Sequence, residues 1–514
     1  MSLALVHSRA GRGTDAPAVS VEVHLSGGLP SFSIVGLPEA AVRESRDRVR
    51  SALLNSGFEF PARRITANLA PADLPKQGGR FDLPIALGVL AASGQVAVAD
   101  LAGAEYLGEL GLGGELRAVH GILPAVAAAS RAGRPVVLPE DNIAEAALVR
   151  DARLLGISCL NELTAQLVAG KTLGFAAAAR SSATEETVQA LPDLADVRGQ
   201  YLGRRALEIA ASGDHPLLLV GPPGCGKTML AERLPGLLPP MNDHEALETA
   251  TVRSVSHQGF CVEDWRRRPF RSPHHGASAV ALVGGGNRAW PGEISLAHNG
   301  VLFLDELAEF DRRVLDHLRE PMESGHITVA RSGWSVRYPS RFQLVAAMNP
   351  CTCGYEGDPS GRCRCTAEQI SRYRSRLSGP LLDRIDLQVR LAPVVATELH
   401  DRTAVPESSA QVRARLSVAR ERQSIRSGVS NAHLPVADLE RCVWLDGACR
   451  ALLESATTRL GFSARAYHRL LRLTRTIADL GDSERVTRDH LCEALQFRAL
   501  DRAMPVEHSP GVAR

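Results

Sequence analysis

Lysine is nearly missing from this sequence, and aromatic residues and long apolar runs are scarce as well. Lysine occurs only at Lys76, Lys171 and Lys227, and aromatic residues account for 4% of the 514 residues. No stretch approaches the roughly 18 apolar residues of a membrane span, and residues 1–10 are too short and too polar for a secretory signal. We therefore expect a cytoplasmic protein with no membrane partner.

An excess of one charge is missing too. The chain has 59 basic and 57 acidic residues, a net charge of +2, which neither requires nor excludes a polyanionic partner. A hydrophobic content of 45% with 23% charged residues is ordinary for globular domains and excludes fibrous and wholly disordered proteins. The length predicts about two to four domains. Since nearly every basic residue is arginine, we expect the lysines to have specific roles.

The ten cysteines are too sparse for a disulfide scaffold, but four of them crowd into one short segment. They form two C-x-C pairs, Cys351 with Cys353 and Cys363 with Cys365. Four thiolates match a tetrahedral zinc site. The usual pairing is C-x-x-C, so reduced cysteines without metal are the alternative. Any zinc would be structural, because four protein ligands leave no open position.

Composition and periodicity divide the chain into four parts. Residues 1–171 alternate short β-like runs with helical ones, and residues 172–196 form an Ala/Ser/Thr-rich linker. Residues 197–394 alternate apolar strands, helices and turns, which is typical of βαβ units around a parallel sheet. Residues 395–514 are helical and rich in arginine. The prediction is therefore an α/β core between an α+β or α/β N-terminal domain and an α-helical C-terminal domain.

Within the N-terminal part, residues 20–24 and 31–35 are predicted to form a hairpin around Gly27 and Gly28. Further elements are predicted there as helix over 42–54, strand over 65–69 and helix over 82–92.

A glycine-rich loop follows the buried-strand run 216–220 and precedes a helix-like run at 229–234. That order predicts a phosphate-binding loop. Its glycines let backbone N–H groups point inward, and the helix N-terminus adds positive potential. Lys227 is expected to reach the outer phosphates of ATP and Thr228 to bind Mg²⁺. The predicted nucleotide contacts in this loop are Gly221, Pro222, Pro223, Gly224, Cys225, Gly226, Lys227 and Thr228.

Polar residues follow two further apolar runs. Asp305 and Glu306 come after residues 301–304, and Asn349 comes after residues 342–348. The first acid is expected to hold the magnesium shell, and the second to polarise water for attack on the γ-phosphate. An amide at position 349 suits the attacking water or a γ-phosphate oxygen; a capping Asn is the alternative.

Arg384 lies in the sequence LLDRIDL after the third of these strands. It is a candidate arginine finger, which would stabilise charge on a neighbouring subunit's nucleotide.

A β-hairpin is predicted over 327–330 and 334–338, with Arg331 at its basic tip. Such a tip suits contact with DNA phosphates inside a ring pore; an ordinary exposed hairpin is the alternative. The glycine-rich segment 283–288, ending at Arg288, is a second candidate pore loop or else a surface loop. His274 and His275 precede it, and we interpret them as surface histidines.

The ordered motifs GPPGCGKT, VLFLDEL, AAMNPC and LLDRIDL resemble the magnesium-chelatase-like branch of AAA+ ATPases. Longer segments at 267–286, 291–299 and 463–480 resemble the ComM/YifB family, as do 36–45 and 74–86 in the N-terminal part. The resemblance covers nearly the whole chain.

This resemblance implies a hexameric ring with ATP and Mg²⁺ between subunits. It also implies a DNA helicase or branch-migration motor that acts on single-stranded or branched DNA during natural transformation. By position, Asn349 would be the first sensor, Arg384 the finger offered in trans and Arg465 the second sensor on the helical lid. Val197 and Gln200 resemble the segment that packs near adenine.

The N-terminal domain resembles the Lon-type protease domain, but the segment where that family carries its serine nucleophile reads KQGGRFD here, from Lys76 to Asp82. No nucleophile occupies it, so we expect no peptidase activity. Lys76 and Arg80 are candidates for a basic surface, with simple solvated charges as the alternative.

Two other functions compete with the DNA motor. One is a metal-insertion ATPase of the magnesium-chelatase type, which the presence of the N-terminal domain disfavours. The other is a protein-remodelling ATPase, for which an aromatic pore loop is expected, whereas the candidate loops are rich in glycine and arginine.

Overall fold

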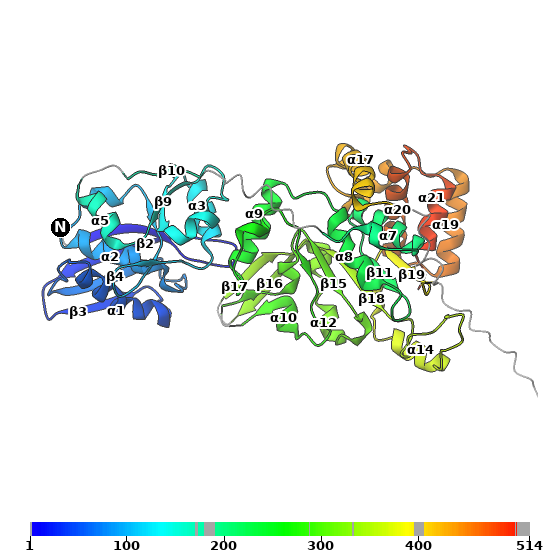
Figure 1. Ribbon diagram of the computed structural model, residues 1–514, viewed down its shortest axis with the longest axis horizontal. Helices are drawn as coiled ribbons and strands as arrows, with labels where there is room; N and C mark the ends of the chain where they lie inside the picture. The colour runs from blue at the N-terminus through cyan, green and yellow to red at the C-terminus, as the bar shows by residue number, and fades with distance from the viewer. Residues whose placement is uncertain are drawn as a thin grey trace, which may run out of the picture.

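The computed structural model describes residues 3–169, 173–178, 191–286, 288–331, 334–394, 406–498 and 500. Figure 1 shows an elongated arrangement, with the N-terminal domain at one end, a parallel sheet in the middle and a helical bundle at the other end. Residues 179–190 of the predicted linker lie outside the described residues. None of the helices in the described ranges is both long enough and apolar enough to cross a lipid bilayer.

The N-terminal domain is built on an eight-stranded mixed sheet in the order β10-β9-β8-β5-β1-β2-β4-β3. Alternating apolar residues bury one face of β1 and β2 against the helices. The strands are β1 (Leu3–Arg9), β2 (Ala18–Ser26), β3 (Ser31–Val35), β4 (Arg64–Ala70), β5 (Glu105–Tyr106), β8 (Val136–Pro139), β9 (Arg153–Ile157) and β10 (Ala176–Ala177), with β6 (Glu109–Leu110) pairing β7 (Leu116–Arg117) separately.

The predicted hairpin between residues 20–24 and 31–35 is wrong. β4 lies between β2 and β3, antiparallel to β2 and parallel to β3. Both edges of β2 are already paired, one with β1 and the other with β4. After the Gly27–Gly28 turn the chain therefore crosses β4, and β3 forms the edge strand of the sheet. β1 is a central strand of this sheet, and it was not among the predicted strands.

The helices predicted over 42–54 and 82–92 are confirmed as α1 (Ala40–Asn55) and α2 (Asp82–Ala92). The N-terminal domain also contains α3 (Ile122–Arg131), α4 (Ile143–Ala146) and α5 (Leu160–Val168). Lys76 is fully buried and its Nζ donates a hydrogen bond to the Pro71 carbonyl. The expectation that Lys76 contributes to a basic surface is therefore wrong.

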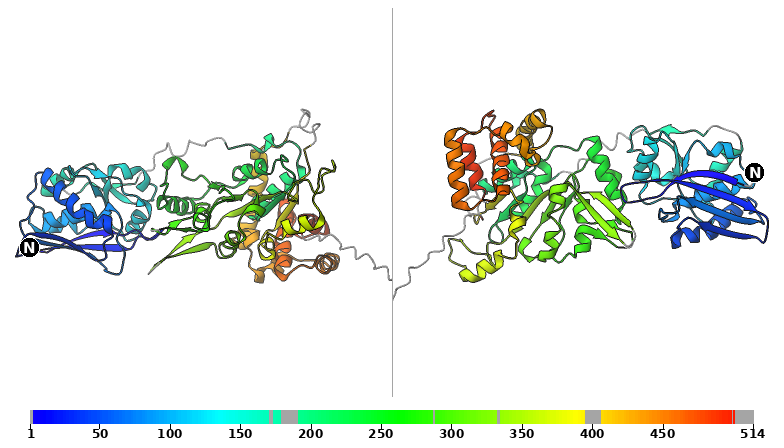
Figure 2. Two further views of the ribbon diagram at one scale, coloured as in Figure 1. Left: turned by 90° about the horizontal axis from the view of Figure 1, so that it is seen from below. Right: turned by 180° about the vertical axis from the view of Figure 1, so that it is seen from behind.

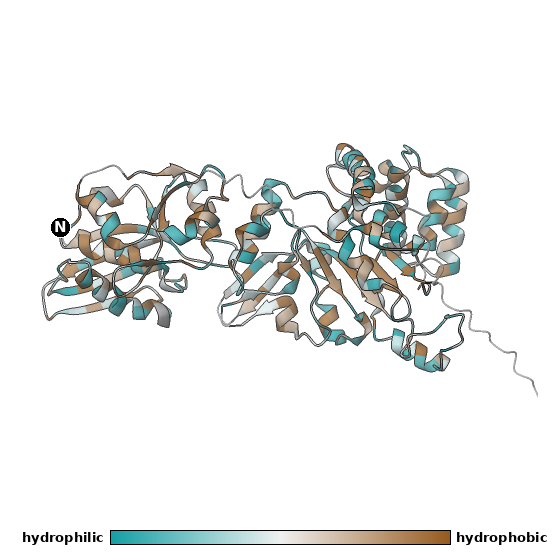
Figure 3. Ribbon diagram, viewed as in Figure 1, coloured by the Kyte–Doolittle hydropathy of each residue, from teal (hydrophilic) through white to brown (hydrophobic). Residues whose placement is uncertain are grey.

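The middle part contains a five-stranded, all-parallel sheet in the order β12-β15-β18-β11-β19. The central strands β11 and β15 are apolar along their whole length, and β18 is apolar apart from Gln343, because both faces of the sheet are covered; Figure 3 colours them mostly brown. The strands are β11 (Leu217–Val220), β12 (Phe270–Arg271), β15 (Val301–Leu304), β18 (Gln343–Met348) and β19 (Leu387–Arg390).

Alternate residues of the central strands β11, β15 and β18 enter different cores. Leu217 and Leu219 of β11 pack with α7, α8 and the lid helices, whereas Leu218 and Val220 pack with α10, α11 and the β16–β17 hairpin. The elements around the sheet are α7 (Tyr201–Gly213), α8 (Lys227–Leu237), α9 (Asp243–Ser254), α10 (Ala279–Val283), β13 (Gly284–Gly285), β14 (Trp290–Pro291), α11 (Glu293–Leu296), α12 (Arg312–Asp316), α13 (Pro321–Ser324), β16 (His326–Arg331), β17 (Trp334–Pro339), α14 (Ala367–Arg374) and α15 (Gly379–Leu382).

Beyond the sheet, the described residues 406–498 form a helical lid that packs against α7 and α8. Figure 2 shows these helices gathered at the end of the molecule opposite the N-terminal domain. They are α17 (Ser409–Ser427), α18 (Val436–Cys442), α19 (Gly447–Leu460), α20 (Ala464–Leu480) and α21 (Arg488–Gln496).

A buried network fixes the lid to the sheet. His215 donates or accepts through both ring nitrogens, with Nδ1 2.7 Å from Asp386 Oδ2 and Nε2 2.7 Å from Thr476 Oγ1 of α20. Arg469 of α20 pairs with the other oxygen of Asp386 at 2.5 Å and also donates to the Arg384 carbonyl.

An apolar cluster joins the N-terminal domain to the core. It combines Val126 and Ala129 of α3 with Ala246 and Ala250 of α9. A hydrogen bond of 2.7 Å between His120 Nε2 and the Ser256 carbonyl lies beside it. The two parts therefore pack directly on each other.

Candidate nucleotide site

The candidate site lies where three neighbouring parallel strands end. Residues 221–226 follow β11, Asp305 follows β15 and Asn349 follows β18. Strand pairing aligns Leu304 with Ala346 and Val220 with Met348. The polar residues predicted from separate segments are thus brought to one edge, as expected for a parallel sheet.

Backbone geometry explains why glycine occupies the loop after β11. Gly224 and Gly226 have φ of +77° and +91°, in the left-handed region that glycine tolerates. A Cβ on Gly221 would lie 2.7 Å from Cys225 Sγ. Helix α8 begins directly after the loop, at Lys227. The first backbone N–H groups of this helix face the space in front of its N-terminus.

Lys227 is surrounded by acceptors from the loop and from the predicted sensor. Its Nζ donates to the carbonyls of Gly221 at 2.8 Å and Pro222 at 3.0 Å, and to Asn349 Oδ1 at 3.1 Å. Burial lowers the pKa of Lys227, and the nearby acids oppose that shift. The Lys227 ammonium group and the Asn349 side-chain amide therefore lie next to each other beside the glycine-rich loop.

Thr228 and Asp305 meet directly. Thr228 Oγ1 donates to Asp305 Oδ2 at 2.9 Å, and the other Asp305 oxygen accepts from the Glu306 backbone N–H at 2.9 Å. A hydroxyl and a carboxylate oxygen in contact are hard ligands of the kind Mg²⁺ prefers. Glu306 has φ of +53°, which turns the chain sharply away after β15.

His275 also belongs to this site, which sequence reasoning missed when it interpreted the histidine as surface. Its Nδ1 lies 2.9 Å from Glu306 Oε2. The signal was available once β12 and β15 are known to be parallel neighbours, because residues following β12 then reach the edge where Glu306 lies.

Gln200 connects the loop to the end of β19. Its side-chain amide donates to the Cys225 carbonyl at 3.0 Å and to the Ala392 carbonyl at 2.7 Å. Val197 is buried in the core cluster beside it. Gln200 therefore lies next to the glycine-rich loop, and the placement of Val197 and Gln200 near adenine stays a prediction.

Arg384 and Arg465 meet at a residue that was not predicted. Both guanidinium groups pair with Glu323 Oε1, at 2.8 Å and 2.9 Å. Arg384 is 8% exposed, and burial lowers its pKa. The loop before β19 and the lid helix α20 are therefore joined through one carboxylate of α13.

The predicted β16–β17 hairpin is confirmed, with antiparallel pairing from His326↔Pro339 to Arg331↔Trp334. Its tip residues 332–333 and the side chain of Arg331 lie outside the described residues. Arg288 is exposed, and its guanidinium carbon lies 5.7 Å from the centre of the Trp290 ring.

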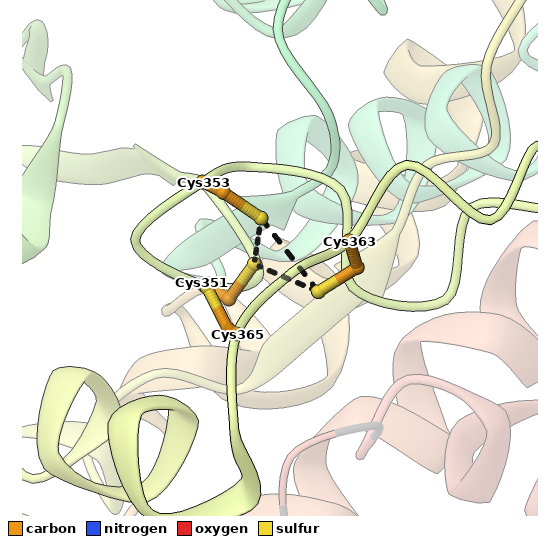
Figure 4. Close-up of side chains that lie close together, drawn as sticks. All are labelled: Cys351, Cys353, Cys363 and Cys365. Carbon is orange, nitrogen blue, oxygen red and sulfur yellow. Dashed lines mark hydrogen bonds between the residues drawn. The ribbon is translucent and has the colours of Figure 1, made fainter.

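The four clustered cysteines converge in the loop after β18 (Figure 4). Sγ–Sγ distances are 3.3 Å for Cys351–Cys353, 3.8 Å for Cys351–Cys363 and 3.6 Å for Cys353–Cys363. All four sulfurs lie within 4.8 Å of one another, including that of Cys365. A tetrahedral zinc with Zn–S bonds of about 2.3 Å requires sulfurs about 3.8 Å apart, so the cluster fits zinc.

Backbone N–H groups of Tyr355 and Arg364 lower the pKa of Cys353 to about 6, which favours the thiolate form that metals bind. The loop also touches the phosphate-binding segment: a Cβ on Gly354 would lie 2.8 Å from Pro223 Cδ.

Family comparisons agree with this geometry. Residues 193–399 match the family described as magnesium chelatase, subunit ChlI; residues 21–142 match subunit ChlI of Mg-chelatase, and residues 406–498 match the ChlI C-terminal region. The 38 kDa magnesium-chelatase subunit of Rhodobacter capsulatus is 27% identical over 54% of this chain and 77% of its own length. Fold, site and matches define a magnesium-chelatase-like AAA+ protein.

Full-length relatives narrow this class. A protein named competence protein ComM from Haemophilus influenzae is 50% identical over 98% of this chain and 99% of its own length. YifB from Escherichia coli is 50% identical over 98% of both chains. The chain belongs to the ComM/YifB family.

Proposed function

We propose that the protein is a magnesium-dependent ATPase that works as a hexameric motor on single-stranded or branched DNA. The contact between Thr228 and Asp305, with Lys227 and Asn349 beside it, carries the ATPase part of the proposal. The full-length likeness to a protein named for competence supports a role in DNA integration during natural transformation and recombination. The β16–β17 hairpin, with Arg331 next to its tip, and the Arg288 segment are the proposed DNA contacts.

Each residue at the strand ends has a defined task in this proposal. Loop N–H groups and Lys227 bind the phosphates, and Thr228 and Asp305 would hold Mg²⁺, which draws charge from the γ-phosphate. Glu306 orients and polarises the attacking water, and Asn349 holds it or a γ-phosphate oxygen.

Arg384 is the proposed finger for the neighbouring subunit's nucleotide, and Arg465 acts as the second sensor. Their shared contact with Glu323 supports this pairing of roles, since one carboxylate holds both cations at one place. Release of either arginine from Glu323 frees its charge for a phosphate.

The ATPase part is tested with Lys227→Ala and Glu306→Gln. Lys227→Ala should abolish nucleotide binding, measured by fluorescent-ATP anisotropy. Glu306→Gln should bind ATP, hydrolyse it at least about 100-fold more slowly and accumulate as hexamers in mass photometry. Lys171→Ala is the matched control, because Lys171 has the same flanking Gly and Thr but no preceding strand motif. Nucleotide binding by Lys227→Ala equal to that of the control would refute the assignment.

DNA dependence separates the motor from its competitors. ATP turnover is measured with single-stranded DNA, a branched junction, an unfolded protein or no addition. The motor proposal expects stimulation by DNA. Stimulation by the protein alone would favour a remodelling ATPase, and Mg²⁺ insertion into a porphyrin with added chelatase partner subunits would favour the chelatase type.

We further propose that Cys351, Cys353, Cys363 and Cys365 hold a structural zinc ion, which stiffens the loop that contacts Pro223. Purified protein should contain about one zinc per chain by elemental analysis. Cys353→Ser should lose it, whereas Cys261→Ser, at an exposed cysteine outside the cluster, should retain it. Zinc below 0.1 per chain in protein purified without chelators would refute this site.

For the N-terminal domain we propose a Lon-type fold without peptidase activity, because residues 76–82 contain no serine, threonine or cysteine. A serine-reactive fluorophosphonate probe should leave the protein unlabelled.

A further inference from the structure

A cavity of about 370 Å³ lies between the N-terminal domain and the core. Segments 77–80 and 118–121 of the N-terminal domain line one side, and Arg288, Trp290 and Tyr338 line the other. Figure 1 shows that the β16–β17 hairpin lies on the side of the core next to the N-terminal domain. Neither the nucleotide site nor the cysteine cluster contributes to this cavity.

Arg80 provides an uncompensated cation in the cavity. Its Nη2 donates to the His120 carbonyl at 2.7 Å, whereas Nη1 is buried with no hydrogen-bond partner among the described residues. Burial and the positive charge of Arg288 lower the pKa of Arg80 to about 10. Two arginines thus face one space and repel each other, an arrangement that an anion would relieve.

The acidic groups nearby do not neutralise this pair. Arg48, the third arginine of the lining, is engaged by Asp82 at 2.7 Å. Glu109 also lines the cavity, but in the described part of the chain no ion pair joins it to Arg80 or Arg288.

An aromatic surface lies beside the two cations. The Trp290 and His120 rings pack edge to face with centroids 5.3 Å apart, and Arg288 lies over the Trp290 ring. Arginines next to a partly exposed indole are typical of binding sites for single-stranded nucleic acid. In such sites the cations bind phosphates and the aromatic rings stack on bases.

The cavity also adjoins the proposed DNA hairpin. The loop between β1 and β2 reaches over β17, where Arg12 donates to the Ser335 carbonyl at 3.5 Å. Gly13, at φ +58°, packs so closely that a Cβ would lie 2.1 Å from Val336 Cγ1. A DNA strand bound along the hairpin would therefore pass this opening.

We propose that this cavity is a subsite for single-stranded DNA, where Arg80 and Arg288 bind one phosphodiester and Trp290 stacks on an adjacent base. The inference rests on the DNA-motor function proposed above and extends it, since the N-terminal domain then completes the DNA path. Free nucleotides share the phosphate chemistry, so the test includes them.

The test uses full-length protein and a fluorescein-labelled oligothymidylate, with binding followed by anisotropy at several salt concentrations. Arg80→Gln and Arg288→Ala should each raise Kd about 10-fold and reduce the slope of log K against log salt by about 0.7. Arg117→Ala is the control, because Arg117 is 60% exposed and pairs with Glu115 outside the cavity. Circular dichroism checks that each variant is folded.

Tryptophan fluorescence gives a second readout that is independent of the arginines. Oligothymidylate should quench wild-type emission, and Trp290→Phe should lose that quenching. Unchanged affinity and salt slope in both arginine variants would overturn the subsite even if DNA still stimulates ATP turnover. Quenching by thymidine monophosphate at micromolar concentration, with no further change on adding the oligonucleotide, would assign the cavity to a free nucleotide and overturn it as well.

Discussion

Asp386→Asn should lower the free energy of unfolding by weakening the attachment of the helical lid to the sheet. Asp386 is fully buried and is held by His215 at 2.7 Å and Arg469 at 2.5 Å, whose side chains are 0% and 11% exposed. The substitution leaves the Arg469 charge buried without its counter-charge. Breaking one partner of such a pair costs about 3–5 kcal/mol, and little of this is screened by solvent.

The free energy of unfolding is measured by urea denaturation followed by circular dichroism. The matched control is Asp438→Asn in the same lid, because Asp438 is 39% exposed in an i,i+3 pair with Arg441, and we expect it to cost less than about 1 kcal/mol. A cost for Asp386→Asn no greater than that of the control would refute the reasoning.

The pH dependence follows from the same contacts. Burial alone would raise the pKa of Asp386, but Arg469 and His215 hold it far below its usual range. The stabilisation is therefore complete above the unfolded pKa of about 3.9 and is lost as pH falls toward the folded pKa. The difference between wild type and Asp386→Asn should be constant from about pH 6 to 8 and shrink below about pH 4.

Three further outcomes are expected. Gly354→Ala should weaken ATP binding, because Gly354 has φ of +84° and an added Cβ would collide with Pro223. Gly357→Ala is the control: Gly357 has φ of +78° with open space around it, so this variant should lose only about 1–2 kcal/mol of stability. Equal ATP affinities of the two variants would contradict this prediction. His275→Ala should raise DNA-independent ATP turnover several-fold in a coupled assay, because it frees Glu306, and His274→Ala should not. Gln200→Ala should raise the KM for ATP about 10-fold, and an unchanged KM would remove Gln200 from the site.

Much of the candidate site was predictable because its strands are buried on both faces. β11 and β15 consist entirely of buried apolar residues, so each strand is visible as an apolar run and the polar residues after it mark its end. Parallel pairing then brings those ends together, which is why Thr228 contacts Asp305 and Lys227 contacts Asn349.

Contacts that depend on non-local pairing were not predictable in the same way. The chain between β2 and β3 has the turn chemistry of a hairpin, yet β4, which comes later in the sequence, pairs with both strands. Similarly, nothing in the local sequence connects His275 to Glu306 or Glu323 to the two arginines. Those contacts depend on which strand neighbours which and on how the lid docks.

The rarity of lysine has a practical consequence at the nucleotide site. Lys227 carries the only side-chain amine within residues 197–394, and the amine of Lys76 is sealed inside the N-terminal domain. A reagent that acylates primary amines therefore reports on a single loop of the core. Protection of the Lys227 peptide from acylation, measured by mass spectrometry, would report the fraction of chains with nucleotide bound in the loop. The measurement needs neither a labelled nucleotide analogue nor a substitution.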